Sequence, residues 1–332
     1  MGYRSFNRRS ILQSAMAVVL AAAGAIHAGS AMAQDFPSRA VRIVVPYQAG
    51  GSSDLVVRTI ADPLSKELGV PVEVDNRPGG GGVVGAQAVI GSPADGYTVF
   101  FGLNSLAINT VKQNPPYDVQ KDFMPVIQIG ENPQVLYVSG KTPASNGAEF
   151  LAWAKENKGK LNFASQGVAA PTHIAMVRLS SGNDLDIEPV VYKGSADNIR
   201  AIIAGEAHIG MDTFGTLKPF AESGEIKLIA YTTVDDNPLY PDLQNLEEAG
   251  LQLLDNRAWY GFFAPAGTPE DAVTKLNAGV NKVLQENEAA RDALAKIGAT
   301  VVGGTPEKFK SFVDGQVDIY RKVIADAGLV IE

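Results

Sequence analysis

The chain has 332 residues, of which 45% are hydrophobic and 19% are charged, and its formal net charge is −8 at pH 7. This length allows a large core and two domains, while the acidic balance argues against nucleic acid and against an anionic membrane surface as partners. The sequence contains no cysteine. It therefore cannot form disulfides, and it lacks the residue to which a lipid anchor would be attached.

Residues 1–33 have the pattern of an export signal. Three arginines precede the uncharged apolar run 15–26, and residues 31–33 read Ala-Met-Ala, a small-residue cleavage site. We therefore expect cleavage after Ala33 and a free, acidic periplasmic protein. Residues 7–13 ("NRRSILQ") resemble a twin-arginine signal but depart from it at three places, so the twin-arginine and general secretory routes both stay open.

The rest of the chain alternates strand and helix patterns. Residues 40–46 predict a strand, and a small-residue turn leads from it into a helix with an apolar face from Val57 to Leu68. Further strands are expected at 71–76, 96–103, 134–139, 161–165, 187–192, 207–212, 226–233 and 257–265, and further helices at 82–92, 147–159, from about 172, 196–206, 269–287, 288–298 and 306–328. This alternation predicts two α/β lobes whose ligand-binding loops face each other across a cleft.

The glycine-rich stretch 76–85 ("NRPGGGGVVG") fits G-x-G-x-x-G through Gly80, Gly82 and Gly85. A dinucleotide site also needs an acid about 20 residues further on, whereas Asp95 follows Gly85 after only 10, in a segment that reads as a turn. No G-K-[S/T] follows, so a P-loop is not expected. We interpret the run as a tight turn with close helix packing, and a role in lining a cleft stays open.

Two other segments pass from a strand through small residues into a helix. In 46–54 ("PYQAGGSSD") several backbone N–H groups can converge at the helix start and bind an anion, although an ordinary N-cap turn is equally compatible. In 163–173 ("FASQGVAAPTH") the hydroxyls of Ser165 and Thr172 are further donors. Three small residues there leave backbone N–H groups accessible: Gly167, Ala169 and Ala170.

Residues suited to catalysis are few. Outside the export signal the histidines are His173 and His208, and neither H-E-x-x-H nor G-x-S-x-G is present. Asp197 and Asp212 could form a carboxylate pair. Asp212 lies at a strand end, where it would either cap neighbouring groups in a structural role or line a site. We therefore expect no enzyme, no metal and no cofactor. Three aromatic residues at strand ends or turns are candidates for either a cleft or the core: Tyr47, Tyr192 and Trp259.

An ordered set of motifs between residues 42 and 269 resembles a known family. The stretches are "RIVVPYQAGGSSDLVVR", "VEVDNRPGGGGVVGAQ", "SPADGYTV", "YDVQKDFMPV", "GKLNFASQG" leading to "THIA", "VVYKGSADNI", "IIAGEAHIGMD" and "GFFAPAGTP". In this order they resemble the Bug family, the TctC-like substrate-binding proteins of tripartite tricarboxylate transporters. The resemblance covers nearly the whole chain after the signal.

The resemblance implies an α/β fold, the periplasmic binding protein of the second structural type, with two lobes around a central cleft. Two strands near 128–138 and 256–264 would cross between the lobes. Residues 35–132 together with 258–332 would form one lobe, and residues 133–257 the other. In this family the glycine run is a turn beside the cleft.

The resemblance also implies a function. The protein would capture a small organic carboxylate, such as a di- or tricarboxylate, an aromatic acid or an amino acid, and deliver it to a large and a small integral membrane subunit. It would be a monomer. A sensory binding protein that presents the same ligand to a signalling receptor is the alternative, and a secreted enzyme is the least expected.

The ligand-binding residues that the resemblance implies lie mainly on two loops, where backbone N–H groups and hydroxyls would hold one carboxylate. They are Tyr47, Gln48, Ala49, Gly50, Gly51, Ser52, Ser53, Ser165, Gly167, Val168, Ala169, Ala170, Thr172, Tyr192 and Asp212. The family usually has S-x-G-x-G-[T/S] in the second loop, and this chain has alanine at 169 and 170 instead. We therefore expect a backbone-only grip, another hydroxyl donor such as Thr172, or a different ligand class.

Overall fold

The computed structural model describes residues 36–165, 170–233, 241–252, 257–326 and 328. Its strands are β1 (Val41–Val45), β2 (Val72–Asn76), β3 (Thr98–Leu103), β4 (Phe123–Ser139), β5 (Asn162–Ser165), β6 (Glu188–Val191), β7 (Ile209–Thr213), β8 (Ile226–Tyr231), β9 (Arg257–Pro265) and β10 (Thr300–Val301). Its helices are α2 (Ser52–Leu68), the 3-10 turn η1 (Gly80–Gly82), α3 (Val83–Ile90), α4 (Asn104–Thr110), α5 (Val119–Asp122), α6 (Gly147–Glu156), α7 (Pro171–Gly182), α8 (Ser195–Ala204), α9 (Phe214–Glu222), α10 (Glu270–Glu286), α11 (Glu288–Lys296) and α12 (Pro306–Asp326). Four short elements, α4, α5, α9 and β10, were not expected from the sequence.

The first lobe is built on the parallel strands β2, β1 and β3, continued by the antiparallel strands β9 and β4. Successive strand residues point to opposite faces, so Ile43 and Phe101 pack against α2, α10 and α11. Val44 and Phe100 pack on the other face, against α3, α4 and α12. Helices thus cover both faces, which explains why these strands read as almost continuous apolar runs.

The second lobe repeats this arrangement around β7, β5 and β6, in which β5 is parallel to both neighbours. The antiparallel strand β4 lies between β7 and β8. One face is covered by α6 and α7, with Phe150 and Leu179 in its core. The other face is covered by α8 and α9, with Ile199 and Leu217 in its core.

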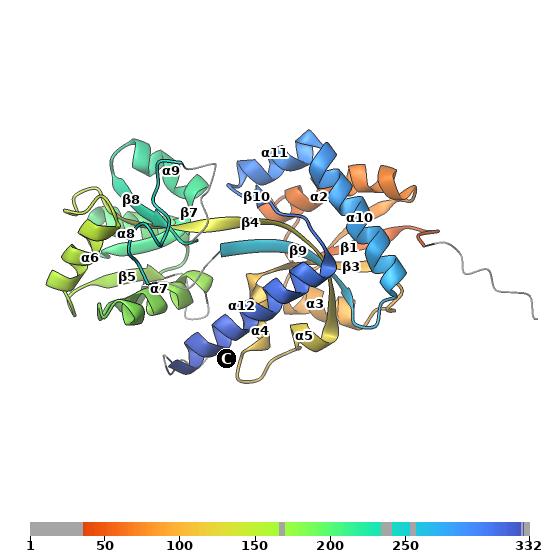
Figure 1. Ribbon diagram of the computed structural model, residues 1–332, viewed down its shortest axis with the longest axis horizontal. Coiled ribbons are helices and arrows are strands. Elements are labelled where there is room, and N and C mark those ends of the chain that lie inside the picture. Colours follow the sequence, from red (N-terminus) through yellow and green to blue (C-terminus); the bar gives the residue numbers. More distant parts are fainter. Residues whose placement is uncertain (1–35, 166–169, 234–240, 253–256, 327, 329–332) are drawn as a thin grey trace, which may run out of the picture.

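Strand β4 belongs to both lobes (Figure 1). From Phe123 to Pro133 it pairs with β9, and from Gln134 to Ser139 it pairs with β7 and β8. The change of partners falls at Pro133, which has no N–H to donate to a ladder. This strand is longer than the crossing strand that the resemblance implies near 128–138.

The core position of Trp259 answers a question that the sequence left open. Its side chain is 0% exposed and packs edge-on against Phe309 and Phe312 of α12. Trp259 is therefore a core residue and does not line a cleft. Among the described residues, no helix combines the length and the apolar character that a bilayer crossing needs.

Gly261 on β9 tests the packing of α12 on the sheet. A Cβ there would meet the Phe309 ring and the carbonyl oxygen of Ile127. Because overpacking a dense core is unfavourable, Gly261→Ala should lower the free energy of unfolding by about 1–3 kcal/mol, measured by urea denaturation. The matched control is Gly315→Ala, which adds its methyl group to open space on exposed α12 and should raise stability by about 0.5–1 kcal/mol. Equal stability of Gly261→Ala and wild type would contradict the close packing of Phe309 against Gly261.

Candidate functional site

A cavity of about 470 Å³ lies where strand ends of the first lobe face the second lobe. Its first-lobe walls follow the carboxyl ends of β1, β2 and β3, which is where α/β sheets bind ligands. The second lobe contributes Pro171, the first residue of α7, and β9 contributes Ala258. The described residues that line it are Tyr47, Gly80, Gly81, Leu103, Asn104, Ser105, Ile108, Asn109, Lys112, Pro171 and Ala258.

The loop between β1 and α2 is held by Asp54, a residue that the sequence analysis did not single out. Its carboxylate is 2% exposed and accepts hydrogen bonds from the Gly50 N–H (2.8 Å) and from Asn76 Nδ2 (2.9 Å). Asn76 also donates to the carbonyl oxygen of Tyr47 (3.1 Å). Both ends of the loop are thereby tied to one carboxylate, and Gly50 adopts the left-handed conformation (φ +82°) that the turn needs.

The charge of Asp54 is stabilised where it lies. Burial by itself would raise the pKa of this carboxyl, but hydrogen bonds from Arg58 (Nε to Oδ2, 2.9 Å), the Gly50 amide and Asn76 together hold its pKa below the ordinary value. Asp54 therefore stays ionised and paired, and it shapes the loop.

Helix α4 supplies much of the cavity wall, and the sequence analysis missed it. Ser105, Ile108 and Asn109 have the spacing i, i+3, i+4 and line the cavity from one face of α4, and Lys112, two residues beyond the end of the helix, also lines it. Tyr47 Oη lies 3.4 Å from Ser105 Oγ. The signal in the sequence was a polar pair, Asn-Ser, directly after a strand. The helix has only seven residues, too short for a clear periodic pattern.

Asn104, at the start of α4, joins three elements. Its Nδ2 donates to the carbonyl oxygen of Arg257 (2.7 Å) and to Tyr320 Oη on α12 (2.9 Å). Its Oδ1 accepts from the Trp259 N–H (3.0 Å). The position of the α4 wall is therefore coupled to β9 and to the C-terminal helix.

The glycine run forms a turn beside the cavity, as the resemblance implied. Gly79 to Gly82 all have φ between 57° and 138°, a region that other residues rarely adopt. Gly80 and Gly81 line the cavity, so the run is both a turn and part of the wall. Asp95, the nearest acid for a ribose, pairs with Arg39 (2.8 Å). The geometry is that of a turn and does not support a dinucleotide fingerprint.

The predicted second loop is only partly within the described residues, since Gly167, Val168 and Ala169 lie outside them. Ser165 is 0% exposed, and its Oγ lies 2.9 Å from His173 Nδ1. Burial lowers the pKa of His173, which keeps the imidazole neutral. This pair anchors the loop where it leaves β5 and where it enters α7.

Three other predicted residues lie around the same loop. The Tyr192 N–H donates to the carbonyl oxygen of Ser165 (2.8 Å), and its ring packs against the core under α8 and α9. Ala170 is the N-cap residue of α7 and makes no side-chain cap. Thr172 Oγ1 is buried and, within the described part of the chain, has no hydrogen-bond partner.

Asp212, at the end of β7, is 6% exposed. Burial raises the pKa of its carboxyl, opposed by hydrogen bonds from Ser195, from the Thr213 N–H (2.8 Å) and from Thr216. The carboxylate thus joins β7 to the starts of α8 and α9. In the structure it accepts hydrogen bonds from groups of its own lobe.

The structure brings only some of the predicted residues to the cavity. Tyr47 lines it, and Ala170 and Thr172 flank its Pro171 wall. Ser165, Tyr192 and Asp212 do not line it. Six predicted residues belong to the loop and helix start beside Tyr47: Gln48, Ala49, Gly50, Gly51, Ser52 and Ser53. The side chain of Ser52 is outside the described set. Among the described residues, no cluster of three or more His, Asp or Glu side chains could hold a metal.

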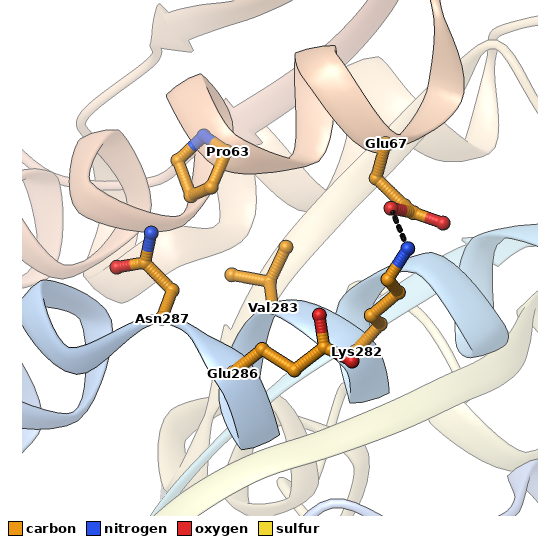
Figure 2. Close-up of a pocket in the computed structure, with 6 residues that line it drawn as sticks. All are labelled: Pro63, Glu67, Lys282, Val283, Glu286 and Asn287. Atoms are coloured by element: carbon orange, nitrogen blue, oxygen red, sulfur yellow. Dashed lines mark ion pairs between the residues drawn. The ribbon is translucent and has the colours of Figure 1, made fainter.

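A second, smaller hollow of about 260 Å³ lies between α2 and α10 (Figure 2). Lys282 reaches across it to Glu67, with Nζ and Oε2 2.7 Å apart. Its walls come from one lobe only. Because movement of the second lobe would not close over it, this hollow lacks the enclosure that the inter-lobe cavity has.

Comparison with known proteins gives a consistent result. Residues 56–329 match the family model described as tripartite tricarboxylate transporter family receptor. The protein BugT of Bordetella pertussis is 29% identical over 96% of this chain and 97% of its own. Two solved structures share the fold: an R. palustris protein with adipate (32% identity, TM-score 0.71, 89% of this chain and 99% of that one) and MatC from Rhodopseudomonas palustris with bound malate (29%, 0.68, 87% and 100%).

The role of Asp54 gives a test that depends on pH. At pH 7, Asp54→Asn should lower the free energy of unfolding by about 1–3 kcal/mol, as for lost hydrogen bonds to a charged group. The folded-state pKa of Asp54 is lowered, so its contribution is complete above the unfolded value of about 3.9 and is lost as the pH falls through the folded value. Urea denaturation from pH 7 to pH 3 should therefore show the two proteins converging. The control, Asp62→Asn on the exposed side of α2, should lower the free energy of unfolding much less than Asp54→Asn does at pH 7. A stability deficit of Asp54→Asn that stays constant from pH 7 to pH 3 would contradict the stabilising role of the ionised Asp54 carboxylate.

Proposed function

The chain belongs to the tripartite tricarboxylate transporter receptor family, and from this premise we propose that it is a periplasmic protein that binds a small organic carboxylate between its two lobes. It delivers this ligand to the large and small membrane subunits of a tripartite tricarboxylate transporter. Family membership confirms the resemblance to the Bug proteins and the two-lobed periplasmic binding-protein fold. Export of residues 34–332 after cleavage at Ala33 is part of the proposal.

The observation that carries the proposal is the cavity between the lobes. It is of the size of a small-molecule site, and it is lined by strand-end loops of one lobe and by the start of α7 from the other. Adipate and malate, found with two related proteins, are both small organic carboxylates. They support a ligand of this class here.

Helix α7 begins at the cavity, helix α2 follows the loop that starts at the lining residue Tyr47, and neither helix has a side-chain cap. The N-cap residue of α2 is Gly51 and that of α7 is Ala170, and neither contributes a side-chain hydrogen bond. Their first-turn N–H groups have no partner in the helix and carry the positive end of its dipole. A carboxylate between them would accept these hydrogen bonds, and we propose that it does. Substitution of Ala170 for the usual Thr or Ser then leaves a grip made mainly by backbone N–H groups.

Lobe movement links ligand binding to delivery in this proposal. We assign residues 35–132 and 258–332 to one lobe and residues 133–257 to the other, because β4 changes partners at this boundary. A ligand that contacts both lobes favours the closed arrangement over the open one. The membrane subunits would recognise the closed arrangement, and the protein itself would carry out no chemistry on the ligand.

The first test is thermal melting of residues 34–332 with a panel of carboxylates. The panel contains aliphatic dicarboxylates, tricarboxylates, aromatic carboxylates and acidic amino acids, with nicotinamide dinucleotide as the negative control. A ligand at about 100 times its Kd adds roughly 2.7 kcal/mol, so one carboxylate class should raise Tm by a few degrees. The proposal fails if no carboxylate shifts Tm, or if the dinucleotide does so instead.

Ser105 tests whether the cavity holds the ligand. Ser105→Leu fills the cavity beside Tyr47 with apolar atoms, and it should weaken binding of the panel ligand at least tenfold, as measured by calorimetry, because the ligand is displaced and a polar contact is lost. Ser311→Leu makes the same change on the exposed side of α12 and should leave the Kd unchanged. Wild-type affinity in Ser105→Leu would exclude this cavity as the site.

A further inference from the structure

Lys112 is the charged residue of the cavity. It follows the last turn of α4, it is half-buried, and all the other lining residues that the structure describes are uncharged. Within the described ranges it makes no ion pair and no hydrogen bond. Other lysines of the same lobe are paired, such as Lys121 with Asp118 (2.7 Å) and Lys310 with Asp314 (2.6 Å).

Lys112 is half-buried and, among the described residues, unpaired on a cavity wall, which leaves its ammonium group free to bind an anion. Taking a charge out of water is unfavourable unless an opposite charge or hydrogen bonds compensate for it. A lysine near a helix C-terminus gains some stabilisation from the helix dipole, but α4 has only seven residues and this contribution is small for a charge that could instead reach solvent. An anion in the cavity would compensate for it in full.

Lys112 and the Tyr47–Ser105 contact lie at opposite ends of α4, and both line the cavity. Ser105 and Tyr47 lie together at the start of α4. Lys112 lies two residues beyond the C-terminal end of α4, and the helical rise from Ser105 to Thr110 alone separates those two backbones by roughly 7.5 Å. The cavity therefore offers one set of polar groups near the start of α4 and one cation beyond its end.

We infer that the ligand carries a second anionic group and that Lys112 binds it. This inference rests on the proposed function, because it takes the first carboxylate to lie at the starts of α2 and α7. Lys112 is then a specificity-determining residue. The uncharged wall between the two ends, which includes Ile108 and Leu103, suits the carbon chain or ring that joins two acidic groups.

The experiment compares diacids with monoacids of the same skeleton by calorimetry. The pairs are succinate with butanoate, adipate with hexanoate, and terephthalate with benzoate. For the best-bound skeleton, wild type should prefer the diacid at least tenfold, as expected for a charge-assisted hydrogen bond. Lys112→Gln should weaken diacid binding much more than monoacid binding and so remove most of this preference, and Lys112→Arg should retain most of it. Lys66→Gln, which removes an exposed charge from α2, is the control for long-range electrostatics and should behave as wild type.

Each other outcome has a definite meaning. If wild type binds diacid and monoacid equally, or if Lys112→Gln keeps the preference, the role of Lys112 is overturned while the proposed function stands. If Lys112→Gln weakens both acids to the same degree, Lys112 holds the shared carboxylate or the fold, and the inference is again wrong. If wild type binds no acid of either kind, the proposed function fails, and this inference fails with it.

Discussion

The architecture depends on one strand that is hydrogen-bonded in two sheets. The 17 residues of β4 pair with β9 up to Pro133 and with β7 and β8 from Gln134 onward. Buried polar groups hold both sides of this change: Glu131 pairs with Arg257 of β9, and the Gln134 N–H donates to Thr232 Oγ1 (3.0 Å). A slip of one residue would turn every side chain of β4 to the wrong face in both lobes. The register of this strand therefore fixes how the two lobes are joined.

The position of the cavity follows from that junction. Because β4 and β9 lie antiparallel between the lobes, the carboxyl ends of the parallel strands of the first lobe face the start of α7 in the second. Asn104 extends the coupling, since one amide side chain contacts the backbone of β9 on both sides of Ala258 and the Tyr320 hydroxyl of α12. The α4 wall cannot move without disturbing a bond to β9 or to α12. A rigid wall on one lobe and a helix start on the other suit a site that closes on its ligand.

An acidic protein can still bind an anion when its local charges are arranged for that purpose. The net charge is −8, yet the two buried acids nearest the proposed loops are each occupied: Asp54 by Arg58, Gly50 and Asn76, and Asp212 by hydroxyl and N–H groups of its own lobe. Among the described residues, those that line the cavity are uncharged except for Lys112. In the proposed site, backbone N–H groups and this ammonium group would act at close range, whereas the net charge is spread over the surface and screened by salt.

The sequence by itself determined the alternation of strands and helices, the glycine turn and the family, because apolar periodicity, N-cap residues and ordered motifs are local properties. It predicted the β1–α2 loop and Tyr47 as part of the site for the same reason. Only the tertiary structure decided the length of β4, in which Pro125 and Pro133 obscure the strand pattern and are accommodated by irregular pairing and by the change of partner. It also decided that Trp259 is core, and that Ser105 and Asn109 of the short helix α4, with Lys112 just beyond it, lie on the cavity wall. These last assignments depend on contacts between residues more than 100 positions apart, and no local pattern records such contacts.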